Sequence, residues 1–166
     1  GLAGELGLAE RIEIQMGTLG KALGVSGGYI AGSRPLIDFL INRARSFIFS
    51  TAPSPAIAAA SRASLRIVQS PEGDALRTRL QENLSLLAGA MKAKLPPSAI
   101  MPLILGGEER ALSEAARLQE AGFFVPAIRY PTVPRKTARL RITLSAAQSH
   151  EQIRRLAEAI QENAMG

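Results

Sequence analysis

Residues 17–28 read GTLGKALGVSGG, and this stretch determines how the first part of the chain is understood. Five of its twelve residues are glycine, which is typical of a loop where the backbone approaches another group closely. Residues 11–16, just before it, alternate between apolar and polar side chains and predict a buried β-strand. Residues 29–31 predict a second short strand. The sequence therefore places Lys21 in a glycine-rich connection that directly follows a strand.

Two kinds of site use a lysine in such a loop. The phosphate loop of nucleotide hydrolases needs glycine at position 15 and serine or threonine at position 22, and the chain has Gln15 and Ala22 there, which excludes it. A Schiff-base site needs a primary amine that attacks an aldehyde, and the hydroxyl of Thr18 is available to a phosphate group. A solvated loop lysine explains the spacing at least as well, so the residues alone leave both interpretations open.

Serine–proline pairs mark the starts of two predicted helices, because serine caps a helix N-terminus and proline fits the first turn. The first helix is predicted over residues 54–69, and the second begins at Ser70. Apolar residues three or four positions apart extend the second helix to Leu95, where two prolines end it. A further helix is predicted over residues 35–45.

Beyond these prolines the pattern changes to short alternating elements. Strands are predicted over residues 100–105, 123–129 and 138–144, and a helix over residues 108–121. Ser149 and Gln152 form a capping box that opens a last helix. This pattern indicates an α+β arrangement with a small antiparallel sheet. With a boundary near Ser70, the predicted domains cover residues 1–69 and 70–166.

Composition narrows the classes of function. The 166-residue chain has no cysteine, which excludes a disulfide scaffold, a thiolate zinc site and a cysteine nucleophile, and its single histidine argues against a histidine-rich metal site. The net charge of +6 fits anionic ligands, but basic residues are scattered and aromatic residues are few, so a nucleic-acid surface is a weak interpretation. We expect a cytoplasmic protein, without a metal and without a membrane segment, because no signal peptide or long apolar run is visible.

Three strings carry a resemblance to a known family. They are TLGKALG at 18–24 with GG at 27–28, FSTAPSPA at 49–56, and IRYPTVP at 128–134 followed by TARLRITLSAA at 137–147. In order and interval these resemble the α-oxoamine synthases, which are fold type I enzymes that use pyridoxal 5'-phosphate (PLP). The resemblance implies an α/β fold: the end of the large PLP-binding domain, followed by the small C-terminal α+β domain with its antiparallel sheet.

The resemblance also implies roles for four residues of the first domain. Lys21 forms the Schiff base with PLP and takes the Cα proton of the amino acid substrate. Thr18 binds the cofactor phosphate. Ser50 or Thr51 reaches the phosphate in the neighbouring subunit, because the family's homodimers build each site from two chains.

In the second domain the resemblance assigns Arg141 to the substrate carboxylate, for which a planar guanidinium is suited. In an alternating strand Arg139 points to the same face, which is either solvated or part of a site. Thr132 either lines the acyl pocket or is a simple turn residue. Lys136 stands where the family usually has glycine, a costly choice if that turn requires a positive φ.

The C-terminal strings are most similar to the family member that condenses L-alanine with pimeloyl-CoA or pimeloyl-acyl carrier protein in biotin synthesis. Other members, which act on glycine or serine, share the scaffold. The chain corresponds to the C-terminal portion of such an enzyme, so we expect this portion alone to be inactive. We also expect its first strand to expose its apolar faces, since the sheet neighbours lie elsewhere. The alternative is a noncatalytic remnant.

Overall fold

The computed structural model describes residues 1–162, which form two compact units. The first unit comprises residues 1–73, and the second begins at Asp74. The division falls four residues after the boundary suggested by the Ser70–Pro71 signal.

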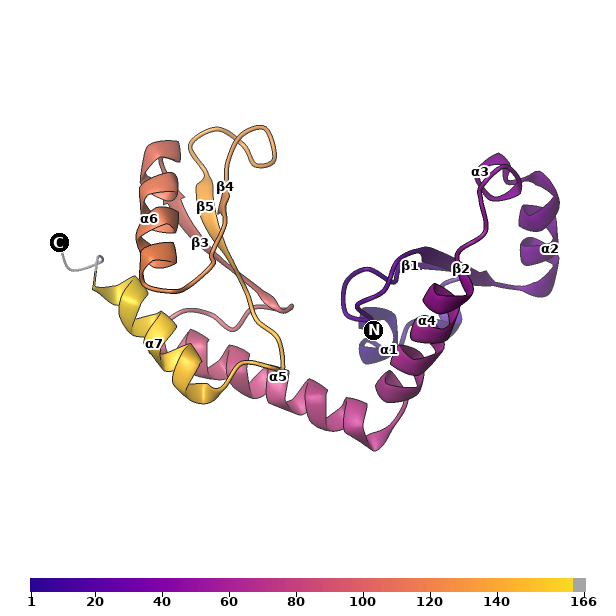
Figure 1. The fold of residues 1–166 in the computed structure, drawn as a ribbon, viewed down its shortest axis with the longest axis horizontal. Helices are drawn as coiled ribbons and strands as arrows, with labels where there is room; N and C mark the ends of the chain where they lie inside the picture. Colours follow the sequence, from indigo (N-terminus) through magenta and orange to yellow (C-terminus); the bar gives the residue numbers. More distant parts are fainter. Residues whose placement is uncertain (163–166) are drawn as a thin grey trace. The chain divides into compact units, whose positions relative to one another are not determined.

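An antiparallel hairpin forms the centre of the first unit (Figure 1). Its elements are α1 (Leu2–Glu5), η1 (Ala9–Arg11), β1 (Ile14–Thr18), β2 (Gly28–Gly32), α2 (Arg34–Arg43), α3 (Arg45–Ile48) and α4 (Pro55–Val68). The predicted strand over residues 11–16 was wrong at its start, because the chain first makes the turn η1, in which the Arg11 amide donates to the Leu8 carbonyl at 3.0 Å. The single predicted helix over 35–45 was also wrong, since Ala44 adopts an extended ψ of 101° between α2 and α3.

Two glycines allow the hairpin to pack closely. Gly17 lies opposite Tyr29, and a Cβ at Gly17 would stand only 2.6 Å from the tyrosine ring. A Cβ at Gly32 would stand 2.7 Å from the side chain of Leu36 and 2.9 Å from the Glu13 carbonyl oxygen. The aromatic ring and the start of α2 therefore occupy the space that any larger residue would need.

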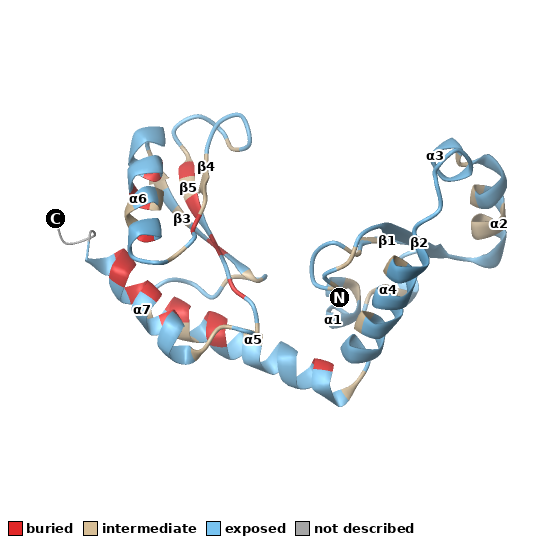
Figure 2. Cartoon of the chain, viewed as in Figure 1, coloured by how far each residue is buried: buried red, intermediate tan, exposed pale blue. Residues whose placement is uncertain are grey.

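The first unit has no buried core of its own (Figure 2). No residue before Gly73 is buried. Ile14 and Met16 on β1 are 53% and 72% exposed, and Phe49 after α3 is 76% exposed. The prediction of a buried strand before Lys21 was therefore wrong for this chain, whereas the expectation that this strand exposes its apolar side chains is confirmed.

A three-stranded antiparallel sheet with three helices builds the second unit, as predicted (Figure 1). Its elements are α5 (Pro71–Ala90), β3 (Ile100–Gly106), α6 (Glu108–Glu120), β4 (Ala127–Ile128), β5 (Ala138–Thr143) and α7 (His150–Gln161). The strand order is β3-β5-β4. The core contains Leu84 and Leu87 of α5, Leu140 and Ile142 of β5, and Ile153 of α7. Apolar burial of this kind is the main stabilising term for the unit.

Two predicted elements are shorter than expected because a cap closes the C-terminus of a helix. The helix predicted to reach Leu95 ends at Ala90, where the Ala93 amide donates to the Ala88 carbonyl at 2.9 Å and Lys92 takes φ 49°. Helix α6 closes in the same way at Gly122, which takes φ 88°. Phe123 then belongs to this cap, so the strand predicted over 123–129 shrinks to β4.

Arg117 connects α6 to α7. Its guanidinium donates to the carboxylate of buried Glu114 and to the main-chain oxygen of Ala159. The hydrogen bond to Glu114 raises the pKa of Arg117 above its ordinary value, because it favours the charged guanidinium. The Glu114 carboxylate orients the guanidinium, and the hydrogen bond from Arg117 to the Ala159 carbonyl joins α6 to α7.

The capping box predicted at Ser149 is confirmed. The Ser149 hydroxyl accepts from the Gln152 amide at 3.2 Å, and the Gln152 side chain accepts from the Ser149 amide at 2.8 Å. We expect Ser149→Ala to lower the free energy of unfolding by about 1 kcal/mol, because the substitution leaves a helix amide without its partner. Urea unfolding followed by far-UV circular dichroism measures this change.

Ser85→Ala is the matched control for Ser149→Ala. Ser85 is exposed in the interior of α5, where alanine is at least as favourable in a helix as serine. Equal losses of stability in both variants would contradict a capping role for Ser149.

Candidate functional site

Lys21 lies in the connection between β1 and β2, where its side chain is exposed. The connection has internal order: the Gly24 amide donates to the Lys21 carbonyl at 3.0 Å, and the Val25 amide donates to the Leu19 carbonyl at 3.0 Å. Gly24 takes φ 65°, a conformation that favours glycine. The Ser64 hydroxyl of α4 donates to the Leu23 carbonyl at 2.8 Å and ties the loop to that helix. The amine therefore projects from a fixed turn.

Thr18 is the last residue of β1, opposite Gly28 across the hairpin. Its side chain is exposed, and within residues 1–162 the structure records no partner for its hydroxyl. A hydroxyl and a primary amine therefore stand three residues apart at one end of the hairpin, while β2 leads to α2 at the other end (Figure 1). Their joint role toward a phosphate and an aldehyde stays a prediction.

Ser50 and Thr51 lie in the connection between α3 and α4, and both are exposed. The Ser50 hydroxyl donates to the Ser46 carbonyl of the preceding helix. Neither residue belongs to the hairpin that carries Lys21. This placement suits the expectation that they serve a neighbouring subunit, which remains a prediction.

Arg139 and Arg141 lie on the same face of β5, as the alternation predicted. Their neighbours Leu140 and Ile142 are buried in the core, whereas Arg141 is exposed and Arg139 is half-buried. Across the strands, Arg141 stands opposite Pro102 and Arg139 opposite Ile104, which is 60% exposed. Both guanidinium groups therefore belong to the face of the sheet turned away from the core.

The segment between β4 and β5 carries Thr132, which is exposed in a turn. The Thr132 amide donates to the Arg129 carbonyl at 2.9 Å. In the same segment Arg135 stacks on Tyr130, with its guanidinium carbon 4.2 Å from the ring centroid. Lys136 takes φ 63°, so this turn does require the left-handed conformation that glycine adopts more easily.

Asn83 is a buried polar residue that the sequence analysis missed. Its side-chain amide donates to the carbonyls of Ser145 and Gln148 at 3.0 and 3.1 Å, which holds the connection from β5 to α7. Its Oδ1 has no hydrogen-bond partner among the described residues. The signal available in the sequence is an asparagine beside leucines 80, 84 and 87, on the apolar side of a long helix.

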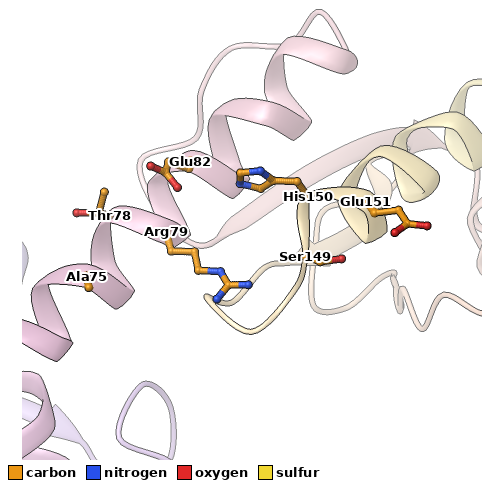
Figure 3. A pocket seen from close by; sticks show the side chains of 7 residues that line it. All are labelled: Ala75, Thr78, Arg79, Glu82, Ser149, His150 and Glu151. Atoms are coloured by element: carbon orange, nitrogen blue, oxygen red, sulfur yellow. The ribbon is translucent and has the colours of Figure 1, made fainter.

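The second unit also contains a cavity of about 650 Å³ at the start of α7 (Figure 3). Its lining residues are Ala75, Thr78, Arg79, Glu82, Ser149, His150 and Glu151, none of which is a predicted site residue. His150 is the first residue of α7. Within residues 1–162 no group of histidine, aspartate and glutamate side chains is placed to hold a metal ion. None of the helices described there has the length and apolar character needed to cross a membrane.

The chain resembles known proteins over nearly all of its length. The family model for aminotransferase class I and II matches residues 2–160. The 8-amino-7-oxononanoate synthase of Anaeromyxobacter dehalogenans is 48% identical over 158 residues, which cover 92% of this chain and 39% of that protein. The synthase of Geobacter sulfurreducens is 46% identical, covering 96% of this chain and 42% of that protein. The chain thus spans about two fifths of the length of these curated relatives.

Solved structures show the same fold. Serine palmitoyltransferase from S. paucimobilis, solved with a bound PLP–myriocin aldimine, matches with a TM-score of 0.91 at 25% identity, over 99% of this chain and 43% of that one. The 8-amino-7-oxononanoate synthase of Francisella tularensis matches with a TM-score of 0.76 at 28% identity, over 92% of this chain and 45% of that one. The predicted fold class, the C-terminal part of a fold type I enzyme, is confirmed.

Proposed function

We propose that this chain, which belongs to the aminotransferase class I and II family, forms the C-terminal part of an 8-amino-7-oxononanoate synthase. The observation that carries the proposal is the 46–48% identity with such synthases across more than nine tenths of the chain. The reaction is the decarboxylative condensation of L-alanine with a pimeloyl thioester, which belongs to biotin biosynthesis. We place the enzyme in the cytoplasm as a homodimer with shared active sites.

Pyridoxal 5'-phosphate is the cofactor of this family's chemistry, and the first unit offers groups that fit it. The exposed Lys21 amine suits the cofactor aldehyde, and the Thr18 hydroxyl suits its phosphate. The turn around Lys21 is rich in glycine, so few side chains stand in the way of a flat ring. When bound, the cofactor accepts the electrons of the bond that breaks at the alanine Cα.

The residues of the chain then have distinct tasks. Lys21 holds the cofactor between turnovers, and its released Nζ takes the Cα proton of alanine. The Thr18 hydroxyl would donate a hydrogen bond to the cofactor phosphate. Ser50 or Thr51 would donate to the phosphate in the neighbouring subunit. Because each task needs residues from other segments or a second chain, this portion alone is expected to be inactive.

The exposed face of β5 supplies the substrate contact. The Arg141 guanidinium presents two parallel N–H groups, which match the two oxygens of the alanine carboxylate. Thr132 lies in the turn before β5 and is proposed to line the path of the acyl chain. The exposure of Arg141 supports this assignment, because its neighbours Leu140 and Ile142 point into the core and leave the guanidinium on the other face of the strand.

A panel of amino acid donors tests the proposal against other reactions of the α-oxoamine synthases. The complete polypeptide, loaded with PLP, is incubated with a pimeloyl thioester and with alanine, glycine or serine, and the product is identified by mass spectrometry. We expect kcat/KM for alanine to exceed that for glycine or serine by at least about tenfold. A shaped pocket discriminates by about this factor between substrates that differ by one methyl or hydroxyl group. A preference for glycine or serine would overturn the proposal.

A further inference from the structure

The main chains of α4 and α5 approach each other closely where the two helices meet. Only two residues separate the end of α4 from the start of α5. A Cβ built at Gly73, in the first turn of α5, would stand 2.4 Å from the carbonyl oxygen of Ile67 and 2.8 Å from that of Val68. Both oxygens belong to the main chain, so no side-chain rotation could make room. We call residues 67–73 the helix joint.

Hydrogen bonds hold the Ile67 carbonyl in this position. It accepts from the Ser70 amide at 3.0 Å and from the Ser70 hydroxyl at 2.8 Å. The same hydroxyl accepts from the Gly73 amide at 3.4 Å. Gly73 is also the only buried residue among residues 1–73. Ordinary contact for a Cβ begins at 3.4 Å, so a side chain at position 73 would require a displacement of about 1 Å within the helix joint.

The helix before the joint is connected to the turn that carries Lys21. The Ser64 hydroxyl of α4 donates to the Leu23 carbonyl at 2.8 Å, two residues after Lys21. Ser64 lies within one helical turn of Ile67, whose carbonyl belongs to the joint. The position of the Lys21 turn therefore follows that of the last turns of α4.

The helix after the joint is packed against the strand that carries Arg141. Leu84 of α5 is buried in the same core as Leu140 and Ile142, the two neighbours of Arg141 on β5. A rise of about 1.5 Å per residue places Leu84 roughly 17 Å along the helix from Gly73. A tilt that moves the start of α5 by about 1 Å therefore moves its core-facing part by more, and β5 moves with it.

We propose that Gly73 is a positioning residue for the reaction. Because it has no side chain, it sets the course of α5 as this helix leaves the first unit, and the placement of Arg141 depends on that course. The proposal rests on the proposed function, in which the Lys21 amine and the Arg141 guanidinium act on one molecule of alanine. A misplacement of about 1 Å, even when it comes from a change far from the chemistry, costs about 10²-fold in rate.

Gly73→Ala in the complete polypeptide tests the proposal, with Gly89→Ala as the matched control. Gly89 lies in the same helix, where an added Cβ would meet nothing within 4 Å. We expect Gly73→Ala to lower kcat/KM for alanine by about 10²-fold and Gly89→Ala to leave it unchanged. Circular dichroism checks the fold of each variant, and borohydride labelling of Lys21 with PLP checks that the Lys21 turn is intact.

A double-mutant cycle with Arg141→Lys separates positioning from a general loss of stability. If Gly73 acts by placing Arg141, adding Gly73→Ala to Arg141→Lys should lower kcat/KM at most a few-fold, because the contact that Gly73 serves is already impaired. Equal losses in the two backgrounds would overturn the proposal, since a merely structural defect adds to any other. An unchanged kcat/KM in Gly73→Ala alone would also overturn it.

A single glycine inserted between Gln69 and Ser70 covers the case in which Gly73→Ala does not fold. The insertion lengthens the helix joint without adding a side chain against the Ile67 carbonyl. We expect the same loss of kcat/KM, and again little further loss when Arg141→Lys is present. An insertion variant with the activity of the unchanged enzyme would contradict the proposal.

A distance measurement keeps the test independent of the proposed reaction. Nitroxide labels are placed at Arg62→Cys on α4 and Ser85→Cys on α5, two exposed positions, with any other cysteines of the complete polypeptide replaced. If the proposed reaction is wrong, no variant yields product from alanine, but pulsed electron paramagnetic resonance still reports on the helix joint. The distance between the labels should change in Gly73→Ala and stay the same in Gly89→Ala. An unchanged distance in Gly73→Ala would overturn the proposal.

Discussion

Replacing Lys21 with alanine in the complete polypeptide will lower kcat by about 10³–10⁴-fold or more, because the substitution removes both the amine that holds the cofactor and the base that takes the Cα proton. The hairpin itself should persist, since the Lys21 side chain is exposed and the turn is held by main-chain hydrogen bonds. Steady-state assays with alanine and a pimeloyl thioester measure the loss. Circular dichroism shows that the fold is retained.

The chain contains three other lysines, Lys92, Lys94 and Lys136, and these provide internal controls. Lys92→Ala removes an exposed amine from a turn in the other unit and should leave kcat unchanged. Borohydride reduction with PLP, followed by peptide mapping, should place the label on Lys21 and lose it in Lys21→Ala. Labelling spread evenly over the four lysines would mean that Lys21 has no special reactivity in this portion, and would contradict its proposed role in holding the cofactor.

Local signals predicted helix starts better than helix ends. Ser54 and Ser149 precede α4 and α7, and both act as caps in the structure, because capping is decided within four residues. The end of α5 was missed because its left-handed cap residue is Lys92 rather than glycine. β4 begins later than predicted, because Phe123, which the pattern assigned to a strand, belongs to the cap at Gly122.

The candidate site likewise contains features that local sequence patterns predict and features that they do not. The position of Lys21 between two strands follows from the pattern of glycines and apolar residues, because a hairpin is a local structure. Its role came from a resemblance, since spacing does not distinguish a reactive lysine from a solvated one. Asn83 was missed because its partners, the carbonyls of Ser145 and Gln148, lie more than sixty residues away. The proposed contact of Ser50 or Thr51 with a second subunit also came from the resemblance, because the periodicity of a single chain carries no information about a partner.

Replacing Arg141 with lysine will lower kcat/KM for alanine by about 10²-fold, and most of the loss will appear in KM. Lysine keeps the positive charge but places it as a single point, so it cannot pair with both oxygens of a carboxylate in one plane. The fold should tolerate the change, because Arg141 is exposed while Leu140 and Ile142 hold the strand in the core. Initial rates over a range of alanine concentrations separate KM from kcat.

Arg154→Lys on the exposed side of α7 is the matched control, with the same chemical change on the same unit. We expect its kcat/KM to stay close to that of the unchanged enzyme. A tenfold excess of alanine should partly restore the rate of Arg141→Lys, because a weakened ground-state contact is compensated by concentration whereas a lost catalytic group is not. If kcat falls while KM is unchanged, Arg141 acts on the reacting bonds rather than on the carboxylate. That outcome would contradict the proposal that the face of β5 turned away from the core binds the substrate.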